Sequence, residues 1–91
     1  MKEKILIALG DIVLANSIEH ELSKLNYRTA VVVDGNKVLD ECKSFSPDLI
    51  VIDLNLSGRS GYEILFEKSF DRFLTKIPVL IVSNSGAALE M

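Results

Sequence analysis

The chain has 91 residues, of which 48% are hydrophobic and 25% are charged, and its formal net charge is −3. This length fits a single domain with one core, and the apolar content excludes a disordered or fibrous chain. Because the net charge is negative and the Lys and Arg residues are scattered, we expect no direct binding of nucleic acid.

The first predicted elements are a strand, a helix and a second strand. The apolar run at residues 5–9 predicts a strand buried on both faces, and it is too short for a signal peptide or a membrane span. Asp11 has the position of a helix N-cap, and the helix should run to about Leu25, with Ile18, Leu22 and Leu25 buried. Residues 29–33 are rich in β-branched residues and predict the second strand.

The middle of the chain repeats the strand and helix pattern. After an Asp-Gly-Asn turn at residues 34–36, a second helix should turn Val38, Cys42 and Phe45 inward. Pro47 blocks further helix, and residues 49–52 form the most apolar strand, which leaves Asp53 at its carboxyl end.

The last third predicts a third helix and a fourth strand. A loop over residues 54–60 precedes a helix over residues 61–73, in which Tyr62 and Phe66 should lie on the core side or the helix face. Residues 79–82 form the fourth strand, and the polar turn at 83–86 could cap a short terminal helix. This alternation predicts an α/β fold with a parallel sheet that helices cover on both faces.

Three polar residues follow predicted strands, namely Asp11, Asp53 and Ser83. In open parallel sheets, reactive groups gather at the carboxyl ends of the strands. A carboxylate at that rim, as expected for Asp53, can act as a nucleophile towards a phosphoryl donor. A strand-end Asp also often binds the backbone N–H groups of its own loop, and the spacing alone does not choose between these roles.

The segment 47–65 (PDLIVIDLNLSGRSGYEIL) resembles the third-strand signature of response-regulator receiver domains of bacterial two-component signalling. Residues 4–7, the turn at 34–35 and residues 77–83 are also similar to their receiver counterparts, in the same order. The resemblance implies a flavodoxin-like three-layer sandwich with strand order 2-1-3-4, formed by residues 1–91 as one incomplete receiver-like domain.

The resemblance also implies roles for particular residues. Asp53 would be the phosphoacceptor of a phosphorelay, so that the chain would be a phosphoprotein. Ser83 and Asn84 would contact the phosphoryl group, and Mg²⁺ would be held by Asp53, the backbone carbonyl of Asn55 and, weakly, Asp11. The expected partner is a sensor histidine kinase or another signalling protein, and the expected location is the cytoplasm, with no membrane contact.

The chain departs from the receiver pattern at two places. Receivers place two acidic residues directly after the first strand, where this sequence has Leu9 and Gly10, so we expect weak or no Mg²⁺ binding and poor phosphorylation from small phosphodonors. The usual fifth strand, with its Lys, and the fifth helix are also missing. We therefore expect an exposed edge on the fourth strand, which a homodimer, strand exchange or a partner's strand would cover, unless the chain is a piece of a longer protein.

Several functions remain open from the sequence. The first is a receiver that is phosphorylated on Asp53, and the second is a pseudo-receiver interaction module that signals without phosphorylation. A nucleotide-binding or flavin-binding flavodoxin-like domain is a weaker third, because the loop at residues 9–11 lacks a glycine-rich phosphate cradle. We expect no enzyme, since His20 should lie on the solvated side of its helix and Cys42 should be a small buried hydrophobe.

Overall fold

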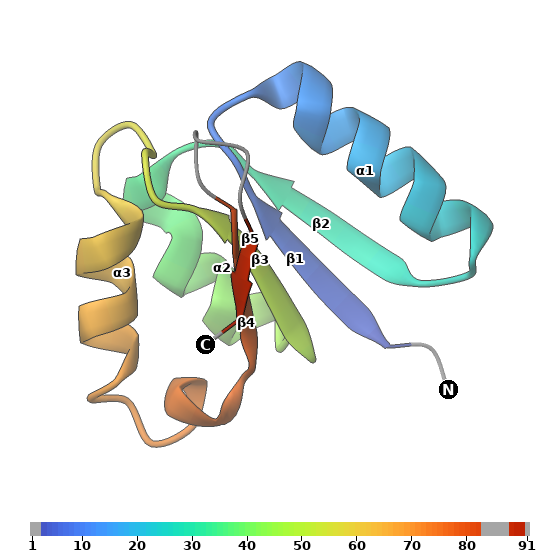
Figure 1. Cartoon of the computed structure of the whole chain (residues 1–91). Coiled ribbons are helices and arrows are strands. Elements are labelled where there is room, and N and C mark those ends of the chain that lie inside the picture. The colour runs from blue at the N-terminus through green and yellow to red at the C-terminus, as the bar shows by residue number, and fades with distance from the viewer. Residues whose placement is uncertain (1–2, 83–87, 91) are drawn as a thin grey trace.

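The computed structural model describes residues 3–82 and 88–90 (Figure 1). Strands and helices alternate along most of this part of the chain. Their order is β1 (Lys4–Ala8), α1 (Ile12–Lys24), β2 (Arg28–Val32), α2 (Val38–Phe45), β3 (Leu49–Asp53), α3 (Gly61–Lys68), β4 (Val79–Val82) and β5 (Ala88–Glu90). Two short 3₁₀ turns, Gly35–Lys37 and Leu74–Lys76, precede α2 and β4. None of the helices described within residues 3–82 and 88–90 has the length and hydrophobicity of a membrane-spanning segment.

Four parallel strands form the sheet in the order β2-β1-β3-β4, which confirms the predicted order. The strands β1 and β3 lie in the centre, and their apolar side chains are buried because helices cover both faces. In the register, Ala8 lies opposite Ile52, and Asp53 lies opposite Val82. The carboxyl ends of β1, β3 and β4 therefore meet at one edge of the sheet.

The sheet continues beyond β4 with the antiparallel strand β5, in which Ala88, Leu89 and Glu90 pair with Val82, Ile81 and Leu80. The prediction of a short terminal helix is therefore wrong for residues 88–90. The prediction of an open edge on β4 is also wrong, because a strand of the same chain already pairs with that edge. A return strand satisfies the β4 backbone groups, whereas a helix would leave them unpaired.

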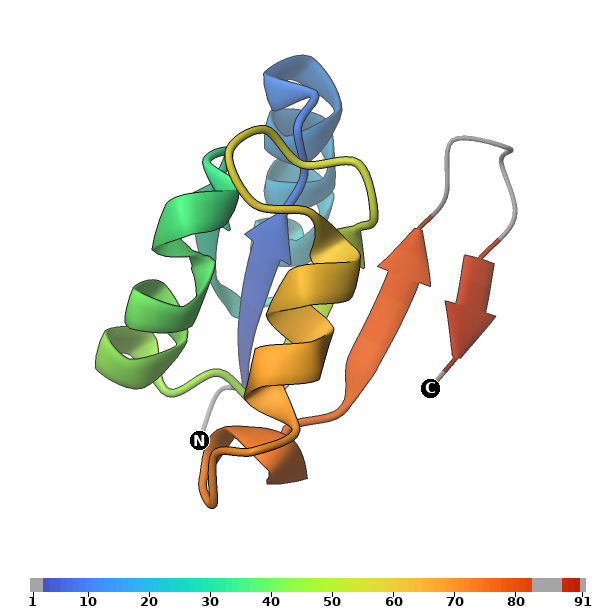
Figure 2. The ribbon, with the colours of Figure 1, turned by 90° about the vertical axis from the view of Figure 1, so that its left-hand side faces the viewer.

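The helices α2 and α3 lie on one face of the sheet and α1 lies on the other (Figure 2). The core accordingly has one layer on each face of the sheet. The larger layer packs Leu6, Ile50 and Ile52 against α2 and α3, and the smaller layer packs Ile7, Leu9 and Val51 against α1, through residues such as Ala15. Val38 and Cys42 on α2 are buried as predicted, and Phe45 is half-buried. Leu25 is exposed, so its predicted burial is wrong; it lies past the end of α1, as the C-cap.

The third helix is shorter than predicted, since α3 ends at Lys68 rather than at residue 73. The side chain of Asp71 explains where the helix stops. Its Oδ1 accepts hydrogen bonds from the backbone N–H groups of Phe73 and Leu74, both at 2.9 Å, and so begins the next turn. These bonds lower the pKa of Asp71, and the bond from Leu74 N–H contributes most to this effect. An aspartate that caps a new turn competes with continuation of the old helix.

Candidate functional site

Asp53 is the last residue of β3, and it lies half-buried at the carboxyl edge of the sheet. Its Oδ1 accepts a hydrogen bond of 3.0 Å from the backbone N–H of Asn55, so this oxygen holds the first turn of the following loop. Within the described residues, its Oδ2 has no hydrogen-bond partner that the structure records. The Asp53 carboxylate therefore has the loop-capping role that the sequence allowed, and its second oxygen is not used for that bond.

Gly61 lets α3 begin directly beside the end of β3. A Cβ on Gly61 would lie 2.6 Å from the backbone oxygen of Asp53 and 2.7 Å from the Cα of Leu54. The helix start is fixed by a capping box, in which Glu63 N–H donates to Ser60 Oγ at 3.2 Å and Glu63 Oε1 accepts from Ser60 N–H at 3.4 Å. The loop after Asp53 is thus held at both of its ends.

A second loop packs against the loop that follows Asp53. The backbone N–H of Gly35 donates to the carbonyl of Ser57 at 2.9 Å, and Asp34 forms an isolated parallel bridge with Ser57. The Asp34 side chain accepts from Asn36 N–H at 2.9 Å and so caps the short helix before α2. The β2 to α2 connection therefore supports the loop that carries Asn55, and Asp34 is already engaged in local structure.

The carboxyl end of β1 has no acidic side chain at the two positions that follow the strand. Leu9 is only 1% exposed and packs in the core layer beneath α1. Gly10 lies beside the loop of Asp53, and a Cβ built on it would lie 3.5 Å from the backbone oxygen of Asn55. A side chain at position 10 would therefore start next to the carbonyl that the family resemblance assigns to Mg²⁺.

Asp11 acts as the N-cap of α1, as the sequence predicts. Its Oδ1 accepts hydrogen bonds from Val13 N–H at 3.0 Å and Leu14 N–H at 3.1 Å. In residues 3–82 and 88–90, no group of three or more His, Cys, Asp or Glu side chains is placed to hold a metal ion. The donor set at this rim, Asp53 with the Asn55 carbonyl and a capping Asp11, fits Mg²⁺ poorly, since this ion favours carboxylate oxygens in octahedral geometry.

The predicted contacts of the phosphoryl group, Ser83 and Asn84, lie outside the described residues. The last described residue before them is Val82, which lies opposite Asp53 in the β3–β4 register. The sequence places Ser83 directly after this residue.

Arg59 forms an ion pair that the sequence does not predict. Its two Nη atoms donate to the two carboxylate oxygens of Glu67, each at 2.6 Å. The cation of this loop is therefore tied to α3. No regular sequence spacing predicts contact between two residues that lie eight positions apart on either side of a helix start. The sequence therefore contained no signal for this ion pair. The capping box could have been found, because Ser60 and Glu63 have its spacing.

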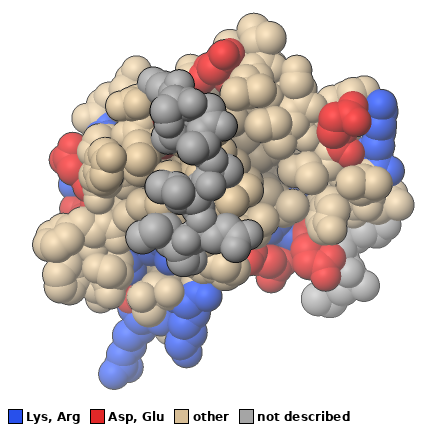
Figure 3. Space-filling model, in the orientation of Figure 1, with Lys and Arg blue, Asp and Glu red and all other residues tan. Residues whose placement is uncertain are grey.

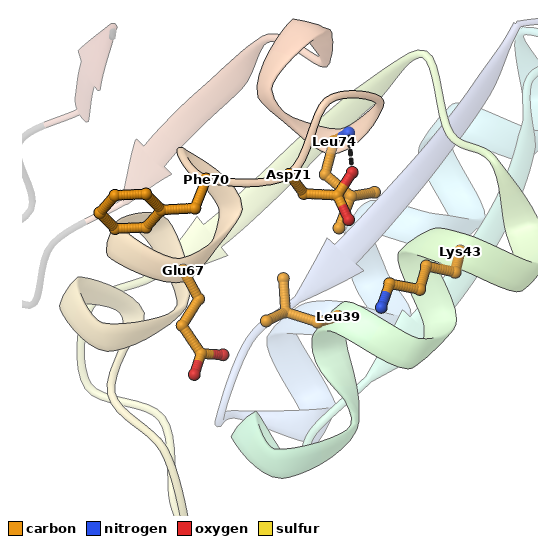
Figure 4. Close-up of a pocket in the computed structure, with 6 residues that line it drawn as sticks. All are labelled: Leu39, Lys43, Glu67, Phe70, Asp71 and Leu74. Carbon is orange, nitrogen blue, oxygen red and sulfur yellow. Dashed lines mark hydrogen bonds between the residues drawn. The ribbon is translucent and has the colours of Figure 1, made fainter.

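The remaining candidate residues have structural roles or face solvent. Cys42 is buried, and its burial raises the pKa of the thiol to about 11, so the thiol stays neutral and is a small core residue as predicted. His20 is exposed on α1, as predicted. A hollow of about 320 Å³ lies between α2 and the end of α3 (Figure 4). Residues such as Leu39, Lys43 and Asp71 line it, and Asp53 is not among its lining residues.

Charge on the face shown in Figure 3 is mixed. Acidic side chains lie at several separate places, and basic side chains project mostly at the lower edge.

The comparison with protein families identifies the family of the chain. The family model described as "Response regulator receiver domain" matches residues 5–90. The chain belongs to the response regulator receiver family. As a receiver domain it has the expected α/β architecture and is a module of two-component signalling proteins.

Named relatives and solved structures agree with this membership. The receiver is 28% identical over 86 residues to a probable transcriptional regulator, ycf29, of Pyropia yezoensis. This match covers 94% of the chain and 39% of the relative. It is similar to the structure of the phosphorylated cyanobacterial phytochrome response regulator RcpA, with 27% identity and a TM-score of 0.82. This match covers 91% of the present chain and 66% of RcpA. It is also similar to the receiver domain of the sensor histidine kinase PA1611 of Pseudomonas aeruginosa PAO1, whose crystal structure has a magnesium ion in the active-site cleft. The identity is 25% and the TM-score is 0.82, and the match covers 89% of this chain and 66% of that one. The chain therefore spans well under half of the curated relative and about two thirds of each solved neighbour.

Proposed function

We propose that this receiver accepts a phosphoryl group on Asp53 within a two-component phosphorelay. The observation that supports the proposal is the half-buried carboxylate of Asp53 at the rim of the sheet, where Oδ1 accepts the bond from Asn55 N–H and no hydrogen bond to Oδ2 is described within residues 3–82 and 88–90. In the transfer, Oδ2 attacks the phosphorus of a phosphohistidine, the P–N bond breaks, and the imidazole leaves with the electron pair and is protonated. The product is an acyl phosphate on Asp53.

The donor that this site suits is a sensor histidine kinase rather than a small phosphodonor. Phosphoryl transfer depends on positioning and on neutralising the developing charge. Because Leu9 and Gly10 replace the expected acid pair and Asp11 caps α1, Mg²⁺ would be held weakly by Asp53, the carbonyl of Asn55 and Asp11. A docked kinase can supply positioning that a small phosphodonor in solution lacks.

Ser83 and Asn84 are proposed to contact the phosphoryl group. The support is their place directly after Val82, the residue opposite Asp53 in the sheet. The hydroxyl of Ser83 and the amide of Asn84 are hydrogen-bond donors that could bind phosphoryl oxygens. The receiver would act as a signalling module in the cytoplasm and would itself be no enzyme.

The test is phosphoryl incorporation measured by intact-protein mass spectrometry. The whole chain is incubated with a phosphorylated histidine kinase, and separately with acetyl phosphate, both with Mg²⁺. We expect one phosphoryl group from the kinase, little from acetyl phosphate, and none in the Asp53→Asn variant. Asp40→Asn is the matched control, because it removes an exposed carboxylate of α2 and should leave incorporation unchanged.

Two results would contradict the proposal. Incorporation that persists in Asp53→Asn would place the phosphoryl group elsewhere. No incorporation from any of a panel of phosphorylated kinases, by a chain that circular dichroism shows to be folded, would favour the pseudo-receiver interaction module. Rapid Mg²⁺-dependent labelling by acetyl phosphate would overturn the claim of a weak metal site.

A further inference from the structure

Lys68 is the last residue of α3, and among the residues that the structure describes it is the one charged side chain that is buried, with 8% exposure. The helix turns it inward together with Gly61 and Ile64. Tyr62 and Phe66 are exposed, so of the two positions predicted for them they take the helix face. A buried lysine is unusual, because lysine is almost never fully buried unless it is paired.

The ammonium group of Lys68 has no described partner of opposite charge. No hydrogen bond or ion pair of this side chain is described within residues 3–82 and 88–90. Its titratable neighbour on α2 is Cys42, whose thiol stays neutral because burial raises its pKa to about 11. Burial also lowers the pKa of Lys68, as expected for a cation that has lost water without gaining an anion. A bound anion would supply the missing charge.

The Lys68 side chain lines a hollow of about 290 Å³ between the end of α3 and the start of β4, which we name the α3–β4 hollow. In the described part of the chain, no side-chain nitrogen or oxygen is both fully enclosed and without a hydrogen-bond partner. Because the Lys68 ammonium group has no such partner, it is open to solvent, and the α3–β4 hollow is the open space beside it. Lysine often buries its carbon chain in this way and brings only its charge to water.

The lining of the α3–β4 hollow suits an organic anion. Lys68 and Lys76 line it, and none of its lining residues is acidic. Thr75 adds a hydroxyl group, and residues such as Leu65 and Ile77 add an apolar wall, which an inorganic ion would leave uncovered. The carbonyl end of α3 opposes an anion with roughly half a negative charge, which two full cations outweigh. Basic side chains project at the lower edge of Figure 3, where the turn before β4 lies in Figure 1.

We propose that the α3–β4 hollow binds a small organic carboxylate, whose charged group contacts Lys68 and Lys76 and whose apolar part lies on the apolar wall. Small-molecule sites usually occupy ~300–1,000 Å³, so a hollow of about 290 Å³ suits a short ligand. A free carboxylic acid and the C-terminal carboxylate of an apolar residue share this chemistry. The hollow lies at the start of β4, whereas Asp53 lies at the carboxyl edge of the sheet, so the site is independent of phosphorylation.

The first test is a titration of the isotope-labelled whole chain with hexanoate, followed by nuclear magnetic resonance at the amides of Ser69, Lys76 and Val79. We expect saturable shifts with a dissociation constant in the millimolar range, and much weaker shifts with hexanol or inorganic phosphate. A short peptide that ends in a free leucine carboxylate, compared with its amide, tests the protein source. The tighter of hexanoate and the peptide identifies the source. No saturation with either carboxylate would overturn the proposal, and so would hexanol or phosphate that binds as well as hexanoate.

The second test removes the cations one at a time. Lys68→Met keeps an unbranched side chain without the charge and should weaken hexanoate binding about tenfold or more, as expected for a hydrogen bond to a charged group. Lys76→Met should weaken it about threefold, because Lys76 is exposed and screened by solvent. Lys37→Met is the matched control, since it removes an exposed lysine outside the hollow. With folding checked by circular dichroism, wild-type affinity in Lys68→Met would place the carboxylate elsewhere and contradict the proposal.

A third readout separates binding from a purely structural role of Lys68. Bound hexanoate should raise the pKa of Lys68, because the carboxylate favours the charged amine, and binding should weaken as the pH rises through this pKa. The resonance of the Lys68 ε-methylene group follows the titration with and without hexanoate. Cys42 and Lys76 are the other titratable groups described beside Lys68, so their titrations should be followed in parallel. An unchanged Lys68 titration at saturating hexanoate would show that the carboxylate does not contact this residue.

Discussion

The carboxyl ends of β1 and β3 lie side by side at one edge of the sheet, but they differ in what they present. The end of β3 presents Asp53, whose carboxylate holds its own loop. The end of β1 presents Leu9, which belongs to the core, and Gly10, which has no side chain. The difference shows that neither the fold nor the placement of the Asp53 carboxylate at this edge requires acidic residues at positions 9 and 10. The receiver architecture can therefore remain where the metal acids are absent.

The largest expected effect tests the core role of Leu9. The variant Leu9→Asp places a carboxylate at a position that is 1% exposed, beneath α1. We expect a loss of about 4 kcal/mol or more in the free energy of unfolding, because a buried unpaired charge is among the most costly changes. Urea denaturation followed by circular dichroism measures the loss. Val13→Asp, at an exposed site of the first turn of α1, is the control and should change stability little. A Leu9→Asp chain as stable as this control would show that position 9 can accept an acid.

A smaller effect is expected at the end of β3. In Gly61→Ala, the new methyl group would lie 2.6 Å from the backbone oxygen of Asp53, so α3 and the strand must move apart. We expect a loss of about 1–3 kcal/mol, the usual range for overpacking. Gly10→Ala is the matched control, because its methyl group meets Asn55 at an ordinary 3.5 Å. Equal stability of the two variants in thermal unfolding would mean that α3 does not pack tightly on this strand.

The smallest expected loss of stability concerns Asp11. It separates the contribution of the hydrogen-bonded cap from that of the negative charge. Asp11→Ala removes the acceptor for Val13 and Leu14 N–H groups and should cost about 1 kcal/mol. Asp11→Asn retains an oxygen acceptor and should lose only a few tenths of this amount. The same urea titrations measure both variants. If Asp11→Asn were as destabilised as Asp11→Ala, the contribution of Asp11 would come from its charge rather than from the cap geometry.

Much of the fold could be predicted because strong local signals agree with the tertiary structure. The apolar runs that became β1, β3 and β4 lie between helices on both faces of the sheet, and Asp11 is a cap residue at a helix start. The wrong predictions concern segments in which another interaction outweighs the sequence pattern. Phe66, Phe70 and Phe73 have helical spacing, yet the cap formed by Asp71 begins a new turn. Residues 88–90 pair with an available strand edge, which the sequence pattern did not reveal.

The candidate site was predictable in position but not in detail. The strand pattern placed Asp53 at the rim, and the structure adds its bond with Asn55 N–H. The approach of Gly10 to the Asn55 carbonyl joins two loops that are 45 residues apart, and the Arg59–Glu67 pair joins a loop to a helix face. Such contacts depend on how whole elements pack, so no local spacing rule gives them.

The central claim is that the rim lacks a metal-binding acid beside Asp53, and a Mg²⁺ titration of the wild type and of Gly10→Asp tests it most directly. The amide of Asn55, followed by nuclear magnetic resonance, reports binding at this loop. We predict no saturation of the wild type in the millimolar range. In Gly10→Asp we predict binding about tenfold tighter or more, because the new side chain brings a second carboxylate from a Cβ that lies 3.5 Å from the Asn55 backbone oxygen. This gain should disappear when Asp53→Asn is added. Tight saturation of the wild type, or the same weak binding in both chains, would contradict the account.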